Sequence, residues 1–303
     1  MTHTQKLGHL AAILTIILWG TTFVSTKILL EAYQPVEILF FRFLMGLIAL
    51  TIIYPKPLKG TSLRQELVFA AAGLCGICLY YLLENIALTY TMASNVGVIT
   101  SIAPCFTAIV AYFAHVDEDA INKKFFFGFL VALSGIFLIS FNGAELQLNP
   151  VGDILALLAA LAWAFYAVIT KGIGNYGYNT IVMTRRIFFY GILFMLPSLL
   201  FFDCSWSLLP LQEPAYLLNL LFLGLGASAL CFVTWNYAVK MIGAIQTSIY
   251  IYMVPVITVV TSIIVLDEQI TPMSALGIVL TLGGLVISQY RGKRKACHTT
   301  LTK

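Results

Sequence analysis

Apolar residues fill this chain in ten long stretches, and short polar or charged segments separate them. A helix needs about 20 apolar residues to cross a bilayer, so each stretch is a candidate span. The pattern predicts an all-α polytopic membrane protein with no inserted soluble domain. The ten predicted transmembrane helices are 9–30, 35–54, 67–89, 92–115, 125–142, 152–171, 179–202, 215–239, 243–266 and 272–290.

The composition agrees with a membrane protein. Of the 303 residues, 60% are hydrophobic and only 10% are charged, which is more apolar surface than a soluble domain of this size needs. The first apolar stretch is too long for a signal peptide, and we interpret it as an uncleaved span. Cys75 and Cys78 spell C-x-x-C inside an apolar helix, so we expect packing residues and neither a metal site nor a cofactor.

The distribution of charge predicts the orientation. If the amino terminus is cytoplasmic, most of the 17 basic residues lie in inside segments and none in outside loops. This bias is typical of cytoplasmic loops, so we expect both termini inside the cell. The net charge is +4, and the basic residues behind it lie in short segments where they orient the helices, so we expect no nucleic-acid partner. The inside residues are Lys6, Lys56, Lys59, Arg64, Lys123, Lys124, Lys171, Lys240, Arg291, Lys293, Arg294, Lys295 and Lys303.

One segment occurs twice. The stretch from Gly73 to Glu118 recurs from Gly224 to Glu268, which predicts two structural repeats, 1–145 and 146–290, followed by a basic cytoplasmic tail, 291–303. Five spans per repeat is an odd number, so the second repeat must be inverted relative to the first. The acidic groups that end the fourth and ninth spans are expected to be solvated loop charges. They are Asp117, Glu118 and Asp119, and Asp267 and Glu268.

Four features recur in the same order in both halves. They are an early Trp with a Lys eight residues later (Trp19 and Lys27, Trp163 and Lys171), an N-x-A segment (Asn85, Asn236), a mid-helix Pro before an acidic end (Pro104, Pro255), and a glycine-bearing last helix (from Gly128 and Gly277). Together they resemble the EamA-type branch of the drug/metabolite transporter superfamily over nearly the whole chain.

The resemblance implies a secondary carrier of the inner membrane, often an exporter of amino acids or related small metabolites. It also implies a central cavity lined by the first, third, fourth, sixth, eighth and ninth helices. It does not name the cargo. One position departs from the repeat, because Glu84 in the first half corresponds to Trp235 in the second.

Aromatic residues at mid-span are the first candidates for the substrate pathway. Trp19 and Trp163 lie far from the interfacial belts where Trp usually sits. Thr22 and Phe23 share the helix face of Trp19, and Tyr166 shares that of Trp163. An aromatic cavity suits flat or amphipathic cargo, whereas the alternative is ordinary packing between helices.

Further candidates come from the repeated segment. The aromatic set extends to Tyr80, Tyr81, Tyr250, Tyr252 and Trp235, although only some of the tyrosines can face inward. Asn85 and Asn236 must find partners within the membrane, either in a cavity or as contacts between helices.

The two repeated prolines, Pro104 and Pro255, are candidate hinges. Each removes a backbone hydrogen bond and frees a carbonyl one turn earlier. The alternative is a static kink that neighbouring helices relieve.

Charged residues inside spans are the candidates for gating. Glu84, Lys27 and Arg42 fall in the outer third of the membrane, so a buried carboxylate there must be protonated or paired. One reading is a permanent bridge from Glu84 to Arg42 or Lys27, and the other is a gate that opens when Glu84 binds a proton or a cargo ammonium. Lys171 and Arg185 lie in the inner third of the other half without a matching acid.

These features predict a secondary transporter of small metabolites such as amino acids, with the lipid bilayer as its surroundings and proton coupling through Glu84. Efflux of drugs or toxic cations, and exchange of sugars or nucleotide sugars, remain alternatives. No ATP-binding motif supports a pump, and the spans hold too few reactive groups for an intramembrane enzyme. A receptor is the other non-transporter reading. Small faces on the fifth and tenth spans predict close packing, within one subunit or in a homodimer.

Overall fold

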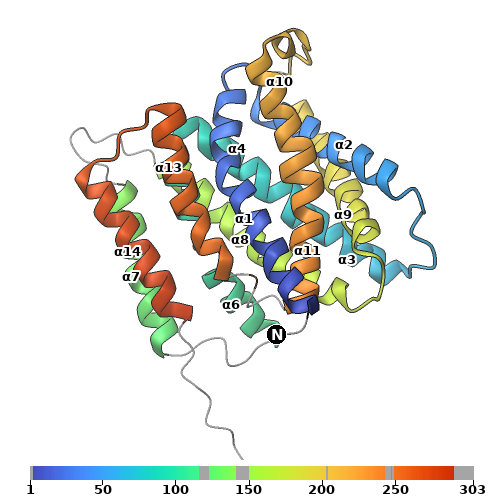
Figure 1. Cartoon of the computed structure of the whole chain (residues 1–303), viewed down its shortest axis with the longest axis horizontal. Helices are drawn as coiled ribbons and strands as arrows, with labels where there is room; N and C mark the ends of the chain where they lie inside the picture. Colours follow the sequence, from blue (N-terminus) through green and yellow to red (C-terminus); the bar gives the residue numbers. More distant parts are fainter. Residues whose placement is uncertain are drawn as a thin grey trace, which may run out of the picture.

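The structure is a computed structural model that describes residues 3–115, 123–140, 150–202, 204–242, 247 and 249–289. The acidic group at residues 117–119 and the basic tail at 291–303 lie outside these residues. Every regular element within them is helical, and the helices pack side by side (Figure 1). Seven helices are long and apolar enough to cross a membrane, and shorter apolar helices cover Tyr250–Leu266 and Pro272–Ile287.

The elements follow the predicted spans closely. Four helices begin at the prolines Pro35, Pro150, Pro214 and Pro272, where the missing N–H has no helical partner to lose. The described elements are α1 (His3–Leu29), α2 (Pro35–Ile53), α3 (Leu63–Gly73), η1 (Leu74–Leu79), α4 (Tyr80–Tyr90), α5 (Ala93–Thr100), α6 (Ala103–Phe113), α7 (Lys123–Ser140), α8 (Pro150–Gly174), α9 (Thr180–Met195), η2 (Leu196–Leu200), η3 (Leu209–Gln212), α10 (Pro214–Leu221), η4 (Phe222–Leu230), α11 (Cys231–Ile242), η5 (Ile249–Met253), α13 (Val254–Leu266) and α14 (Pro272–Gln289).

The third and eighth predicted spans are each interrupted by a π-helical segment. These segments, η1 and η4, fall at the start of the repeated stretch in each half. In η1, a Cβ at Gly76 would collide with the Tyr166 ring, so the glycine lets the two helices approach. Such wide turns leave backbone groups without their usual helical partners and are common at functional sites.

The fourth and ninth predicted spans are broken ahead of their prolines, where the sequence predicted one kinked helix each. α5 ends at Thr100, and α6 starts at Ala103, three residues later, with Pro104 in its first turn. The 3₁₀ turn η5 likewise gives way to α13, which carries Pro255 in its first turn. A proline cannot donate to the carbonyl four residues earlier, which explains why both helices restart at this point.

The helices α7 and α14 run antiparallel along one edge of the bundle (Figure 1, green and red). A Cβ at Gly135 would lie 2.5 Å from the Gly277 carbonyl, and one at Gly284 would meet the Gly128 carbonyl and the Ala132 backbone. The small faces of the fifth and tenth predicted spans therefore pack against each other within one chain. They do not require a homodimer.

This packing predicts unequal effects of substitution at two adjacent glycines of α14. Gly284→Val should lower the free energy of unfolding by about 1–3 kcal/mol, because its side chain has only backbone to displace. Gly283→Val is the control, since nothing lies within 4 Å of a Cβ at Gly283. Thermal unfolding in detergent measures both. Equal melting temperatures for the two variants would contradict the close approach of α7 and α14.

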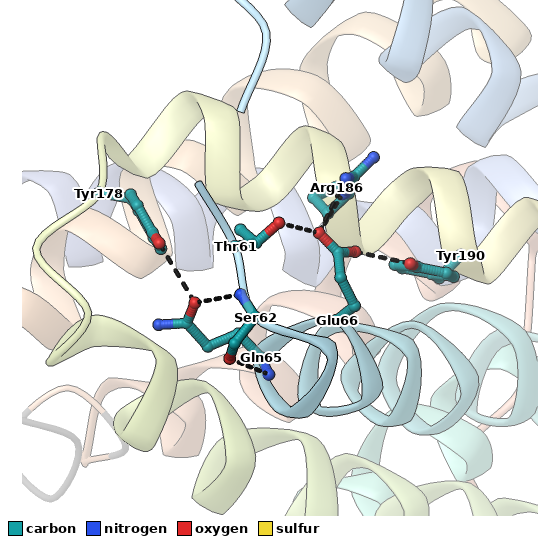
Figure 2. Close-up of polar contacts among 7 residues, drawn as sticks. All are labelled: Thr61, Ser62, Gln65, Glu66, Tyr178, Arg186 and Tyr190. Atoms are coloured by element: carbon teal, nitrogen blue, oxygen red, sulfur yellow. Dashed lines mark hydrogen bonds and ion pairs between the residues drawn. The ribbon is translucent and has the colours of Figure 1, made fainter. Parts of the chain in front are cut away.

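A polar clamp joins the start of α3 to α9 (Figure 2). The Glu66 carboxylate accepts hydrogen bonds from Arg186 Nη2 (2.8 Å), Tyr190 Oη (2.6 Å) and Thr61 Oγ1 (2.5 Å). Beside it, Arg185 donates to the carbonyls of residues 54 and 56, both at 2.6 Å, and so caps the end of α2. Arg185, a candidate gating residue from the sequence, thus fixes the loop between α2 and α3.

Candidate functional site

Aromatic rings from the four helices α1, α4, α8 and α11 meet at the centre of the bundle. The Trp19 ring lies 5.4 Å from Trp163, 5.1 Å from Trp235 and 5.6 Å from Phe232, measured between ring centroids. Tyr80 stands 5.0 Å from Trp163 on the other side. Neither Trp19 nor Trp163 faces lipid, because less than a tenth of each side chain is exposed.

Trp19 is fixed by more than packing. Its indole Nε1 donates a 3.0 Å hydrogen bond to the carbonyl of Ala227, which belongs to the π-helical segment η4. A buried indole N–H needs such a partner, and the Ala227 carbonyl, which can accept two hydrogen bonds, supplies it from within the π segment. The ring is thereby held edge-on to Trp163 at an interplanar angle of 88°.

A cavity lies next to this aromatic cluster. Its empty space, which includes the solvent at its open mouth, is about 510 Å³. Residues on both sides of the broken helices contribute to its wall, so the breaks at Pro104 and Pro255 lie beside the cavity. The lining residues are Trp19, Thr22, Phe23, Tyr80, Tyr81, Glu84, Thr100, Ser101, Ala103, Trp163, Ile251 and Val254.

Glu84 is the acidic residue of this wall. Its side chain is 1% exposed, and neither carboxylate oxygen meets a donor in good hydrogen-bond geometry among the described residues, although the Tyr80 hydroxyl is near enough to act on it. The charge of Arg42 is near enough to act on it, yet no hydrogen bond joins the two groups. A buried carboxyl without a donor favours either a proton or a cationic ligand, because an isolated buried charge is costly.

Arg42 is held by other groups. Its Nε donates to Ser228 Oγ at 3.1 Å, and its Cζ stands 4.4 Å from the centre of the Tyr81 ring and 5.3 Å from that of Phe43. A fully buried guanidinium gains cation–π attraction from such rings. The predicted permanent bridge between Glu84 and Arg42 is therefore not formed in this conformation.

Lys27 does not bridge to Glu84 either. Its Nζ donates to the carbonyls of Leu88 (2.5 Å) and Thr91 (2.9 Å), at the end of α4. Carbonyls at the end of a helix lack the backbone donors of the next turn and carry the negative end of the helix dipole, so they bind the Lys27 ammonium in place of Glu84. The alternative bridge considered from the sequence is thus replaced by a helix cap.

The remaining candidates lie around the cavity and not in its wall. Asn85 donates to the Pro35 carbonyl at 3.0 Å, and Asn236 donates to Thr184 Oγ1 at 2.9 Å, so both join neighbouring helices. Tyr166 is buried behind Trp163, with 4.9 Å between their ring centroids. Tyr252 belongs to η5, whereas its neighbour Ile251 reaches the cavity.

Lys171 lines a second pocket, away from the aromatic cavity. Asn236 and Lys240 contribute to the same pocket, between α8, α9 and α11. The position equivalent to Lys27 in the second half is thus exposed to solvent in this conformation.

A comparison with known families identifies the family of the chain. The sequence profile of the EamA-like transporter family matches residues 6–141 and again residues 150–290. This chain belongs to the EamA-like transporter family. Its multi-pass helical membrane fold and its small-molecule substrate follow from that membership.

Several relatives of this EamA-like chain are transporters by name. A transporter of Archaeoglobus fulgidus is 27% identical over 92% of this chain and 96% of its own length. One of Clostridium kluyveri is 28% identical over 96% of both chains. A probable terminal-alkyne amino-acid exporter of Streptantibioticus cattleyicolor is 25% identical over 95% of this chain and 96% of its own.

A crystal structure shares the fold. It superposes with a TM-score of 0.67 at 18% identity and covers 94% of this chain and 97% of the other. At this level of identity the likeness concerns the helical architecture alone.

Some residues of the EamA-like site were not predicted. Thr100 and Ser101 line the cavity, and the repeat alone could have indicated them, since they stand just before Pro104. Glu268 was expected to be a solvated loop charge, but that interpretation is wrong. Its carboxylate accepts hydrogen bonds from the Ala93 and Ser94 backbone at the start of α5.

Proposed function

We propose that this EamA-like transporter is a secondary exporter of small amine-bearing metabolites, such as amino acids, which it moves by alternating access through the aromatic cavity. The observation that carries the proposal is Glu84, a buried carboxyl in an aromatic wall whose oxygens form no hydrogen bond of good geometry among the described residues. An ammonium supplies the missing donors, and rings such as Trp19 and Trp163 favour both cations and flat side chains. A relative named as a probable amino-acid exporter supports this class of cargo.

The proposed architecture has ten spans in two inverted repeats, 1–145 and 146–290, with both termini in the cytoplasm of the inner membrane. The double match of the family profile and the antiparallel contact between α7 and α14 support it. The basic residues in the predicted inside segments support the orientation.

The proposed coupling uses one carboxyl for two ligands. Glu84 holds either a proton or the cargo ammonium. Binding of cargo therefore releases the proton to the side of the membrane from which the cargo entered. Arg42 stays beside Glu84 in both states, because Ser228 and the Tyr81 ring hold it there. The hinges for the exchange are the two breaks ahead of Pro104 and Pro255, which both border the cavity.

Counterflow in proteoliposomes tests the proposal. The vesicles are loaded with an unlabelled compound, and uptake of the same labelled compound is measured for an aromatic amino acid, its amine without the carboxylate, and its acid without the ammonium. A sugar, a nucleotide sugar and a hydrophobic quaternary cation complete the panel. We expect counterflow of the amino acid or of its amine, and none of the acid. The proposal would be contradicted if none of the compounds that carry an ammonium group showed counterflow, including the case in which only a sugar did.

A further inference from the structure

Two charged side chains from different halves of the chain meet at the turn between α4 and α5. From α1, Lys27 Nζ donates to the carbonyls of Leu88 and Thr91. From the segment after α13, Glu268 Oε1 accepts from Ala93 N at 2.8 Å, and its Oε2 accepts from Ser94 N at 3.2 Å and from Ser94 Oγ at 2.6 Å.

The signs of the two charges match the helix ends they contact. The last carbonyls of α4 form the negative end of a helix dipole, and the first N–H groups of α5 form a positive end. No side chain of its own caps α5 at Met92, so Glu268 supplies the missing acceptor from another part of the chain. Asp267, in the left-handed conformation with φ 52°, ends α13 and turns Glu268 toward α5.

This turn lies directly above the cavity on its predicted outer side. Phe23 in the cavity wall precedes Lys27 by four residues, and Glu84 precedes Leu88 by four, which is about one helical turn in each case. The contacts therefore join α1 and α13 across the outward path from the cavity. The charges of Lys27 and Glu268 are also near enough to attract each other.

We propose that Lys27 and Glu268 are an outer latch, which holds the α4–α5 turn over the cavity in this conformation and releases it when the carrier opens outward. The side chains exchange partners on opening. In the closed state each neutralises a helix end, and in the open state they pair with each other, so neither charge is left alone near the membrane. The latch goes beyond the proposed cargo binding. Only its location on the outer side of the membrane rests on the proposed orientation.

Access to a thiol in the cavity tests the latch without any cargo. Thr22→Cys places the thiol in the cavity wall, and Cys204→Ser removes the loop thiol from the background. A membrane-impermeant thiol reagent is applied to each face of oriented vesicles in turn, and the labelling rate is measured. The variants are K27M, E268Q, K27R and the charge reversal K27E/E268K. The matched control is D267N, which changes the exposed neighbour of Glu268 and tolerates the same φ.

We expect K27M and E268Q each to raise labelling from the outer face by about tenfold, because each loses charge-assisted hydrogen bonds of the closed state. K27R should stay near the parent rate, since a cation still reaches the carbonyls, and D267N should match the parent. The charge reversal should label as fast as the single variants, because it keeps the mutual ion pair but presents the wrong sign to both helix ends. If one single variant does not fold, the other carries the same expectation. Parent-like labelling of the charge reversal, unchanged labelling in the single variants, or faster labelling from the inner face alone would overturn the latch.

Discussion

Glu84→Gln is expected to insert and fold normally but to transport at least about tenfold more slowly than the parent. The amide keeps the size of the side chain and removes its negative charge, and a hydrogen bond to a charged group contributes roughly 1.5–3 kcal/mol. Neither carboxylate oxygen has a hydrogen bond of good geometry among the described residues, and an amide oxygen can still accept from the nearby Tyr80 hydroxyl, so the substitution breaks no observed contact. Counterflow in proteoliposomes, normalised to the amount of folded protein, measures the loss.

The pH profile separates a mechanistic role from a structural one. In the parent, acid should weaken cargo binding, because protonation of Glu84 removes the charge that attracts the ammonium. This dependence should disappear in Glu84→Gln, whereas Glu84→Asp should retain it. Glu31→Gln is the control, since Glu31 is exposed at the surface beside Tyr216. A parent-like rate and pH profile in Glu84→Gln would remove Glu84 from transport, and failure to insert would assign it to structure.

Trp19→Ala is expected to have the largest effect on stability. Trp19 contacts three aromatic side chains and is 9% exposed, so the truncation should cost about 3–5 kcal/mol and remove one wall of the cavity. Trp19→Phe keeps a ring in place but loses the hydrogen bond to Ala227, for which we expect about 1 kcal/mol. Thermal unfolding measures stability, and calorimetric titration with the cargo found by counterflow measures affinity.

Trp206→Phe controls for the loss of an indole elsewhere. Trp206 lies in the loop before η3, where 40% of it is exposed, and contacts Phe40 and Phe41. The Trp206→Phe substitution should change the free energy of unfolding little and leave the cargo affinity at the parent value. If Trp19→Ala and Trp206→Phe were equally stable and bound cargo equally well, Trp19 would be neither a packing centre nor part of the site.

The depth of the central residues could be predicted from the sequence. Span boundaries fix depth to within a turn, since a helix rises about 1.5 Å per residue. Trp19 and Trp163 were placed at mid-span in this way, and their rings lie 5.4 Å apart in the structure. The repeat also indicated where the helices change direction, because Pro104 and Pro255 occupy equivalent positions, but it predicted a kink where the structure has a break.

The partners of the charged residues could not be predicted in this way. Depth alone put Glu84, Lys27 and Arg42 at one level and suggested a bridge among them. Depth does not give the direction of a side chain around its helix, which changes by about 100° per residue. It also ignores backbone acceptors, and the free carbonyls at the end of α4 bind Lys27 instead.

The π-helical segments could not be predicted from the sequence either. One extra residue in a turn leaves an apolar run just as apolar, so hydropathy cannot detect η1 or η4. Their consequence is nevertheless specific, since the Ala227 carbonyl in η4 fixes the Trp19 indole. The contact between Glu268 and α5 was missed because residues 268 and 93 are far apart in the chain.

The exchange of a proton for cargo at Glu84 is tested most directly by proton movement. Proteoliposomes containing a trapped pH indicator receive an outward gradient of the amine-bearing compound that shows counterflow. If Glu84 exchanges cargo for a proton, each cargo molecule that leaves the vesicle is replaced by a proton that enters, so we expect the lumen to acidify with the parent protein and not with Glu84→Gln. Cargo efflux through the parent protein without any change in luminal pH would contradict the exchange of cargo for a proton.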